Sequence, residues 1–195
     1  MKKILVFITA PIIACCSASA VNISMSGTSV FLSDGSTLVP QNGYISVGYF
    51  AGAFSDFSGL ETRDWTDITG ADYIEVVTGA INPAGEIAGS GTPSGISGKT
   101  LHMWIFSSAG TPSGILNTNE FGLYSGSDAN VWVAKGDSPI PPQFNFITAA
   151  SADSSVYGAD TGDNLILQSA VPEPSSFALL AGCFGLAWVM VRRRR

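Results

Sequence analysis

Short stretches of alternating hydrophobic and polar residues, broken about every 8 to 12 residues by Gly, Pro, Ser, Thr, Asn and Asp, fill residues 21–170. This spacing is typical of antiparallel sandwiches and barrels, and no long amphipathic helix interrupts it. The sequence therefore predicts an all-β fold. We expect a single antiparallel β-sandwich, Ig-like or jelly-roll-like, in one domain.

Individual strands follow from the local pattern. Asp34-Gly35 supplies the positive φ of a tight turn and predicts a hairpin over residues 30–39. Residues 44–50 alternate and predict a half-buried strand, whereas residues 101–106 are apolar on both faces and predict a central one. Further strands are predicted at residues 121–124, 131–134, 144–148 and 165–168. One helical turn is predicted after Phe57. Residues 72–77 either continue this helical turn or form a strand of their own.

The first 20 residues have a different pattern, which predicts a signal peptide. Two lysines precede an apolar run over residues 4–14, and Ala18 and Ala20 are small enough for the cleft of signal peptidase. The run spans about 16 Å as a helix, which is too short for a permanent membrane span. We expect signal peptidase to cut after Ala20, so that the mature chain begins at Val21.

A second cut remains open near the same end. The residues 12–15, Ile-Ile-Ala-Cys, are similar to a lipobox, in which Cys15 is acylated and becomes the new N-terminus. The small residues that end at Ala20 favour the ordinary peptidase, because they lie at its usual distance from the apolar run. The mass of the mature N-terminus distinguishes the two.

The last 25 residues have three parts in a fixed order: a proline motif, an apolar stretch and an arginine run. The two prolines keep the motif extended, as a protease cleft requires. The predicted transmembrane helix, residues 176–191, is short for a lasting anchor, and arginines cost about 2.5 to 3.5 kcal/mol each at mid-bilayer, so they stay cytoplasmic. The motif is Val171, Pro172, Glu173, Pro174 and Ser175, and the stop is Arg192, Arg193, Arg194 and Arg195.

Residues 171–195 resemble the PEP-CTERM sorting signal of Gram-negative bacteria, which a membrane protease called exosortase reads. The resemblance implies transient membrane insertion, cleavage near the motif, loss of the helix and transfer to the cell surface or extracellular matrix, alongside exopolysaccharide. It implies exosortase as a partner and brings no catalytic residues. A plain single-span anchor is the alternative, and its weakness is the short span.

Charge and cysteine content limit what the body between the two ends does. Residues 21–170 hold three basic and 14 acidic residues, a net charge of −11, and no cysteine. Such a body repels phosphate backbones, so nucleic acid is excluded as a partner and neutral sugars or cations are favoured. Without disulfides, the hydrophobic core has to hold the fold.

Two groups in the body are candidate binding residues. Asp160, Asp163 and Asn164 bring oxygen ligands together and make calcium a candidate cofactor, although an ordinary Asp/Gly turn explains the same residues. Trp132 beside Tyr124 is a candidate ligand contact if Trp132 faces solvent, since aromatic rings stack on sugars.

Catalytic chemistry has little support in the sequence. His102 is the only histidine and lies in an apolar segment, and no Gly-x-Ser-x-Gly elbow occurs. Two carboxylates suffice for a secreted glycosidase, but most acids here lie in solvated turns. We therefore expect no enzyme and no catalytic residue, but a structural or adhesive matrix protein, with a carbohydrate-binding module as the alternative.

Overall fold

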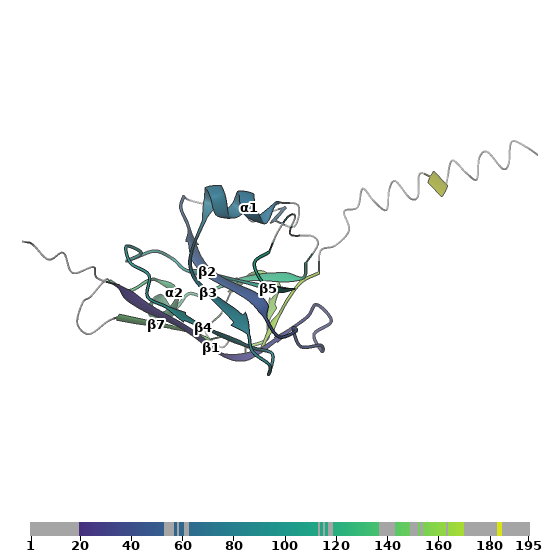
Figure 1. Cartoon of the computed structure of the whole chain (residues 1–195), viewed down its shortest axis with the longest axis horizontal. Coiled ribbons are helices and arrows are strands. Elements are labelled where there is room, and N and C mark those ends of the chain that lie inside the picture. The colour runs from purple at the N-terminus through teal and green to yellow at the C-terminus, as the bar shows by residue number, and fades with distance from the viewer. Residues whose placement is uncertain are drawn as a thin grey trace, which may run out of the picture.

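One sheet of ten strands organises the body of the protein (Figure 1). The structure is a computed structural model, and it describes residues 20–52, 57, 59–60, 63–112, 114, 116, 119–136, 143–148, 152, 154–162, 164–169 and 183–184. The strands are β1 Val21–Phe31, β2 Gly43–Phe50, β3 Tyr73–Ile81, β4 Glu86–Gly91, β5 His102–Ala109, β6 Phe121–Ser125, β7 Gln143–Ile147, β8 Ser154–Tyr157, β9 Ala159–Asp160 and β10 Leu165–Ile166. Their order is β8-β6-β5-β2-β3-β4-β1-β10-β9, and β7 also pairs with β1.

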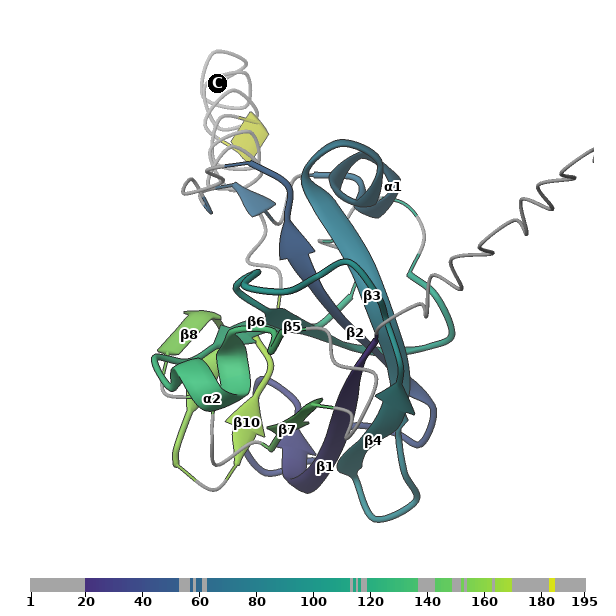
Figure 2. The same cartoon turned by 90° about the vertical axis from the view of Figure 1, so that its left-hand side faces the viewer.

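The sheet curls into a near-closed barrel. Figure 2 shows the strands in a ring that runs from β6 through β5, β2, β3 and β4 to β1, with β10 beside β1. The ring is bridged just after β10, where Gln168 and Phe121 exchange backbone hydrogen bonds of 2.9 and 3.2 Å. The segment after β10 therefore joins β6 and completes the ring, while β10 itself pairs with β1 from the other end of the body.

The predicted all-β class is confirmed, but the predicted two-sheet sandwich is not. The reason lies in β1, which has 11 residues and shifts register between Ser26 and Ser29, where Gly27 has a φ of 119°. Such a bulge bends a strand and lets it change partners. The first half of β1 pairs with β7 and the second half with β10, and both pairs are parallel, which also corrects the antiparallel expectation.

Most predicted strands appear close to their expected bounds, and one prediction is wrong. The hairpin is confirmed, since Gly35 has a φ of 65° and Leu32 N–H donates to Thr37 O at 2.7 Å. Residues 131–134 were expected to form a strand, but helix α2 (Ala129–Trp132) includes the first two of them, and only Val133 makes an isolated bridge, to Thr100. Asp128 caps this helix by accepting from Asn130 N–H at 2.8 Å, and so competes with strand formation.

Strand β2 was predicted to be half-buried, yet its first six residues are buried on both faces. The outer face is covered by the helical turn α1 (Trp65–Asp67), the π-helical turn η2 (Ile68–Asp72) and Leu116. The helical turn expected after Phe57 is thus present, but Asp64 is its N-cap residue. In Figure 1, α1 lies above β2 and β3.

The body has two hydrophobic clusters, one on each side of this part of the sheet. The inner cluster fills the barrel with aliphatic residues such as Ile23, Ile45 and Ile105. The outer cluster is aromatic, and Trp65 in it lies 5.5 Å from Trp104 and 5.0 Å from Phe106, both edge-to-face. Edge-to-face pairs add to the burial energy of such rings.

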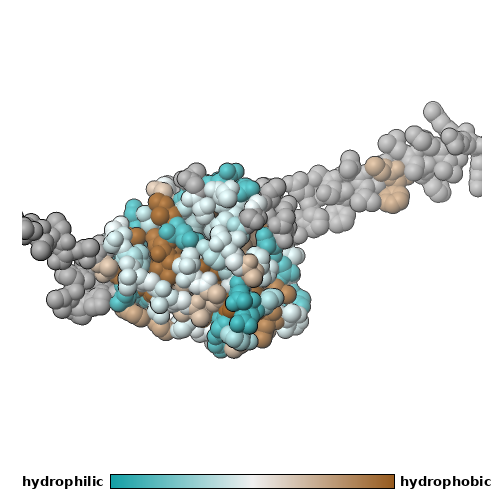
Figure 3. All heavy atoms as spheres, viewed as in Figure 1, coloured by the Kyte–Doolittle hydropathy of each residue, from teal (hydrophilic) through white to brown (hydrophobic). Residues whose placement is uncertain are grey.

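The chain ends carry the predicted addressing segments, and these lie outside the described residues except for Ala20, Val21, Cys183 and Phe184. Among the residues that the structure describes, no helix is long and apolar enough to cross a membrane. The visible face of the body in Figure 3 is mostly hydrophilic or neutral, with small hydrophobic patches.

Candidate functional site

The sorting motif follows directly on the strand that closes the barrel. Leu167 N–H donates to Phe31 O at 2.9 Å, and Gln168 is bonded to Phe121, so the chain is held in the barrel wall as far as Gln168. Only Ser169 and Ala170 separate this residue from Val171. No described strand lies C-terminal to Gln168, so cleavage within the motif removes no strand that the structure describes.

One side chain bonds this closing segment directly, and a second interaction joins the chain just after β1 to the chain just before β6. The Tyr124 hydroxyl donates to Ile166 O at 2.7 Å, and the Glu120 carboxylate accepts from Ser33 N–H and from Ser33 Oγ, both at 2.9 Å. Burial raises the pKa of Tyr124, and the charge of Asp160 adds to the rise, so the hydroxyl stays a donor. The sorting junction, defined here as Ile166–Ser169, is therefore hydrogen-bonded both to β1 and to β6.

Trp132 and Tyr124 do not form the predicted ligand contact. Both side chains are 0% exposed and belong to the inner cluster, so the condition of a solvent-facing Trp132 is not met. The physical reason is α2, which turns Trp132 into the end of the barrel where a strand was expected. Tyr124 instead serves the sorting junction through its hydroxyl.

Two of the three candidate calcium residues, Asp160 and Asn164, flank a turn between β9 and β10. Asp160 Oδ1 accepts from Gly162 N–H at 2.7 Å, and Thr161 N–H donates to Asn164 O at 3.0 Å. Asp163 lies outside the described residues, so the calcium prediction stays a prediction. Among the described side chains, no three His, Cys, Asp or Glu residues are grouped to hold a metal ion.

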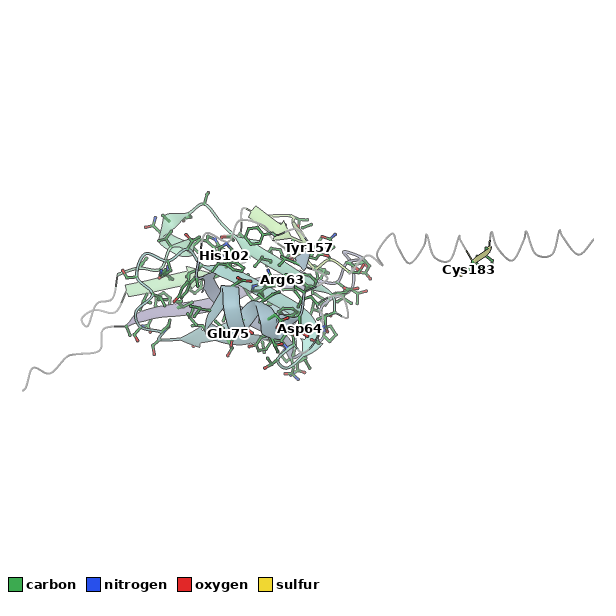
Figure 4. All side chains as sticks on the ribbon, turned by 90° about the horizontal axis from the view of Figure 1, so that it is seen from above. Arg63, Asp64, Glu75, His102, Tyr157 and Cys183 are labelled. Atoms are coloured by element: carbon green, nitrogen blue, oxygen red, sulfur yellow. The ribbon has the colours of Figure 1, made fainter. Side chains whose placement is uncertain are left out.

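His102, which is labelled in Figure 4, lies beside two phenylalanine rings. Its ring is 5.0 Å from that of Phe50, edge-on, and 6.2 Å from that of Phe57. Burial lowers the pKa of His102, against a smaller opposing effect of the Thr100 backbone, so the ring is neutral at ordinary pH. A hollow of about 420 Å³ adjoins it, where Lys99 Nζ lies 5.3 Å from the centre of the Tyr49 ring.

The structure exposes two aromatic residues that the sequence pattern did not single out. Phe144 and Phe146 on β7 are 47% and 45% exposed, while Asn145 between them is 0% exposed. Asn145 Nδ2 donates to Val131 O and Val133 O, and its Oδ1 accepts from Lys135 N–H. Alternation alone assigns the two phenylalanines to the core, so only the contacts of Asn145 reveal the true orientation of the strand.

These observations define an all-β body joined, at its closing strand, to a C-terminal addressing segment. Comparison with known families identifies that segment: the family described as PEP-CTERM protein-sorting motif matches residues 170–195. The predicted resemblance is confirmed, and the motif is that of an exosortase substrate sorted to the outside of the cell. No curated protein and no solved structure matches the chain.

Proposed function

We propose that the barrel is displayed in the extracellular matrix as a structural or adhesive protein, after signal peptidase and exosortase have removed its two ends. The observation that carries this proposal is the sorting motif joined directly to the closing strand of the barrel. The body has no further requirement for the tail, because its described strands end before the motif begins.

The short connection has a geometric consequence for processing. Extended chain advances at most about 3.6 Å per residue, so Pro172 lies within about 15 Å of Gln168. We propose that exosortase acts beside the barrel wall while the body abuts the outer surface of the membrane. The net charge of −11 on residues 21–170 then opposes lasting adhesion to anionic lipid, and cleavage releases the body.

The same composition supports a passive rather than a catalytic role. His102, the only histidine, is packed against Phe50 and Phe57 and is neutral, as a residue of the hydrophobic packing would be. Its ring lacks a carboxylate partner in the described contacts, which a general base of the triad type requires. We propose that the protein acts by packing or adhesion and is not an enzyme.

Cell fractionation tests the proposal. The variant Pro172→Ala/Pro174→Ala loses the rigid extended motif, and we expect at least a ten-fold drop of the protein in the matrix fraction and its accumulation in the membrane fraction. Pro83→Ala is the matched control, because Pro83 lies exposed in the turn between β3 and β4 and its loss leaves sorting unchanged. Deletion of the host's exosortase should reproduce the effect of the motif variant.

Two results contradict the proposal. The first is wild-type protein that stays in the membrane fraction of a host with exosortase. The second is a motif variant that reaches the matrix as efficiently as the Pro83→Ala control. A matrix role additionally requires that cells without this protein lose matrix cohesion, measured as the shear needed to detach a film, and unchanged cohesion overturns it.

A further inference from the structure

The outer face of β4, β1 and β7 is left uncovered by any described element. The inward positions of β1 and β7 are buried, so the alternating side chains of these strands point outward. We call this surface the β7 face and define it by the residues Asn22, Ser24, Ser90, Thr92, Phe144 and Phe146.

Strand register brings the aromatic and polar members of the β7 face together. Asn22 pairs with Phe144, and Ser24 lies between Ser90 on β4 and Phe146 on β7. The two phenyl rings are neighbours, with centroids 6.1 Å apart and planes at 19°. An open hollow of about 400 Å³ lies beside Phe144 and is lined by Asn22, Ser24, Ser90 and Thr92.

The β7 face is uncharged, although the body that carries it is strongly acidic. Glu86 is the only charged residue in β1, β4 and β7, and it pairs with Ser29 at the far end of β4 from the hollow. An anionic ligand is repelled by the net charge of −11 on residues 21–170, and no cation of these three strands attracts an anionic membrane. The charge distribution therefore favours a neutral occupant.

We propose that the β7 face binds a neutral polysaccharide, an inference that rests on the proposed extracellular role. The C–H faces of the sugar rings pack against Phe144 and Phe146, because aromatic side chains bury large apolar surfaces at a wet boundary. The amide of Asn22 and the hydroxyls of Ser24 and Ser90 both donate and accept hydrogen bonds, as sugar hydroxyls do. Few polar groups around an apolar surface are the usual composition of a specific ligand site.

Affinity electrophoresis tests this directly on processed protein recovered from the matrix. Native gels contain dextran, hydroxyethyl cellulose, galactomannan or laminarin as neutral probes, or alginate as an anionic one. We expect retardation by at least one neutral probe and none by alginate. Phe144→Ala/Phe146→Ala should weaken the retardation at least ten-fold, whereas Ile74→Ala, which removes a residue 42% exposed on β3, should leave it unchanged.

Four results overturn the proposal: no retardation by any neutral probe, retardation by alginate, equal retardation of the double variant and wild type, or loss in the Ile74→Ala control as well. Light scattering identifies the main competing occupant, a second copy of the chain. A wild-type dimer that the double variant converts to a monomer, with no glycan retardation, assigns the β7 face to self-association. The recovery of processed protein outside the cell precedes this experiment, so failure here leaves the proposed sorting and display intact.

Discussion

The two outer faces of the barrel differ in whether their aromatic side chains are covered. Outside β2, β3, β5 and β6, the rings of Trp104, Phe106 and Phe121 are fully buried beneath α1, η2 and residue Leu116. Outside β4, β1 and β7, Phe144 and Phe146 remain about half exposed. The aromatic residues of one face are thus covered by local insertions, whereas the exposure of Phe144 and Phe146 is the observation on which the proposed binding surface rests.

The largest expected effect lies on the covered face. Trp65→Ala removes the ring that α1 places against Tyr73, Trp104 and Phe106, and it should lower the free energy of unfolding by about 4 kcal/mol, as is typical for a buried aromatic residue replaced by alanine. Urea denaturation measures this loss. A change below about 1 kcal/mol would show that the covering segment contributes little and would remove the contrast between the faces.

A second variant tests the support of the uncovered face. Asn145→Ala leaves Val131 O, Val133 O and Lys135 N–H without their side-chain partner in a buried site, which should cost about 3 kcal/mol in the free energy of unfolding. Asn22→Ala is the control, since Asn22 points outward from the neighbouring position of β1 and should cost less than about 0.5 kcal/mol. Equal losses would contradict the orientation of β7.

The pH dependence of stability tests whether His102 is buried in the folded protein. Burial lowers the pKa of His102 in the folded protein, while the unfolded chain titrates near the ordinary value of about 6.5. The unfolded state therefore takes up the proton first, and stability falls as the pH drops from about 7 towards 5. His102→Gln should flatten this interval, because the chain has no other histidine; an unchanged slope would place His102 in solvent.

The smallest effect on the free energy of unfolding is expected on the β7 face, where binding is proposed. Phe144→Ala/Phe146→Ala should change the free energy of unfolding by less than about 1 kcal/mol, because both rings are about half exposed. The same urea titration as for Trp65→Ala provides the comparison. A loss as large as that of Trp65→Ala would assign the two rings to the core and contradict a binding surface.

The sequence predicts the strands of this fold better than their arrangement. Strong local signals, such as the Asp34-Gly35 turn and the two-sided apolar run of β5, are matched by the structure. The closure of the barrel depends on a bulge near Gly27 and on pairing between β1 and β10, which lie over 130 residues apart and leave no local pattern. Helix α2 was missed because the Asp128 cap outweighs the β-branched residues after it.

For function, too, the sequence predicts local features better than features that depend on how the strands are arranged. The sorting signal is a linear motif, so its residues identify it without any knowledge of the fold. A binding surface is assembled from β4, β1 and β7, and its members become neighbours only through strand register. Trp132 was selected as a ligand contact because aromatic residues are common in such sites, but burial depends on which way the chain turns at Asp128.

The intact mass of the protein outside the cell tests the central claim, that a barrel complete without its tail is sorted by cleavage beside its closing strand. The predicted mass is that of a chain beginning at Val21 and ending near the motif of residues 171–175, without Cys183 and the four terminal arginines. A mass that includes residues 176–195 would contradict the claim.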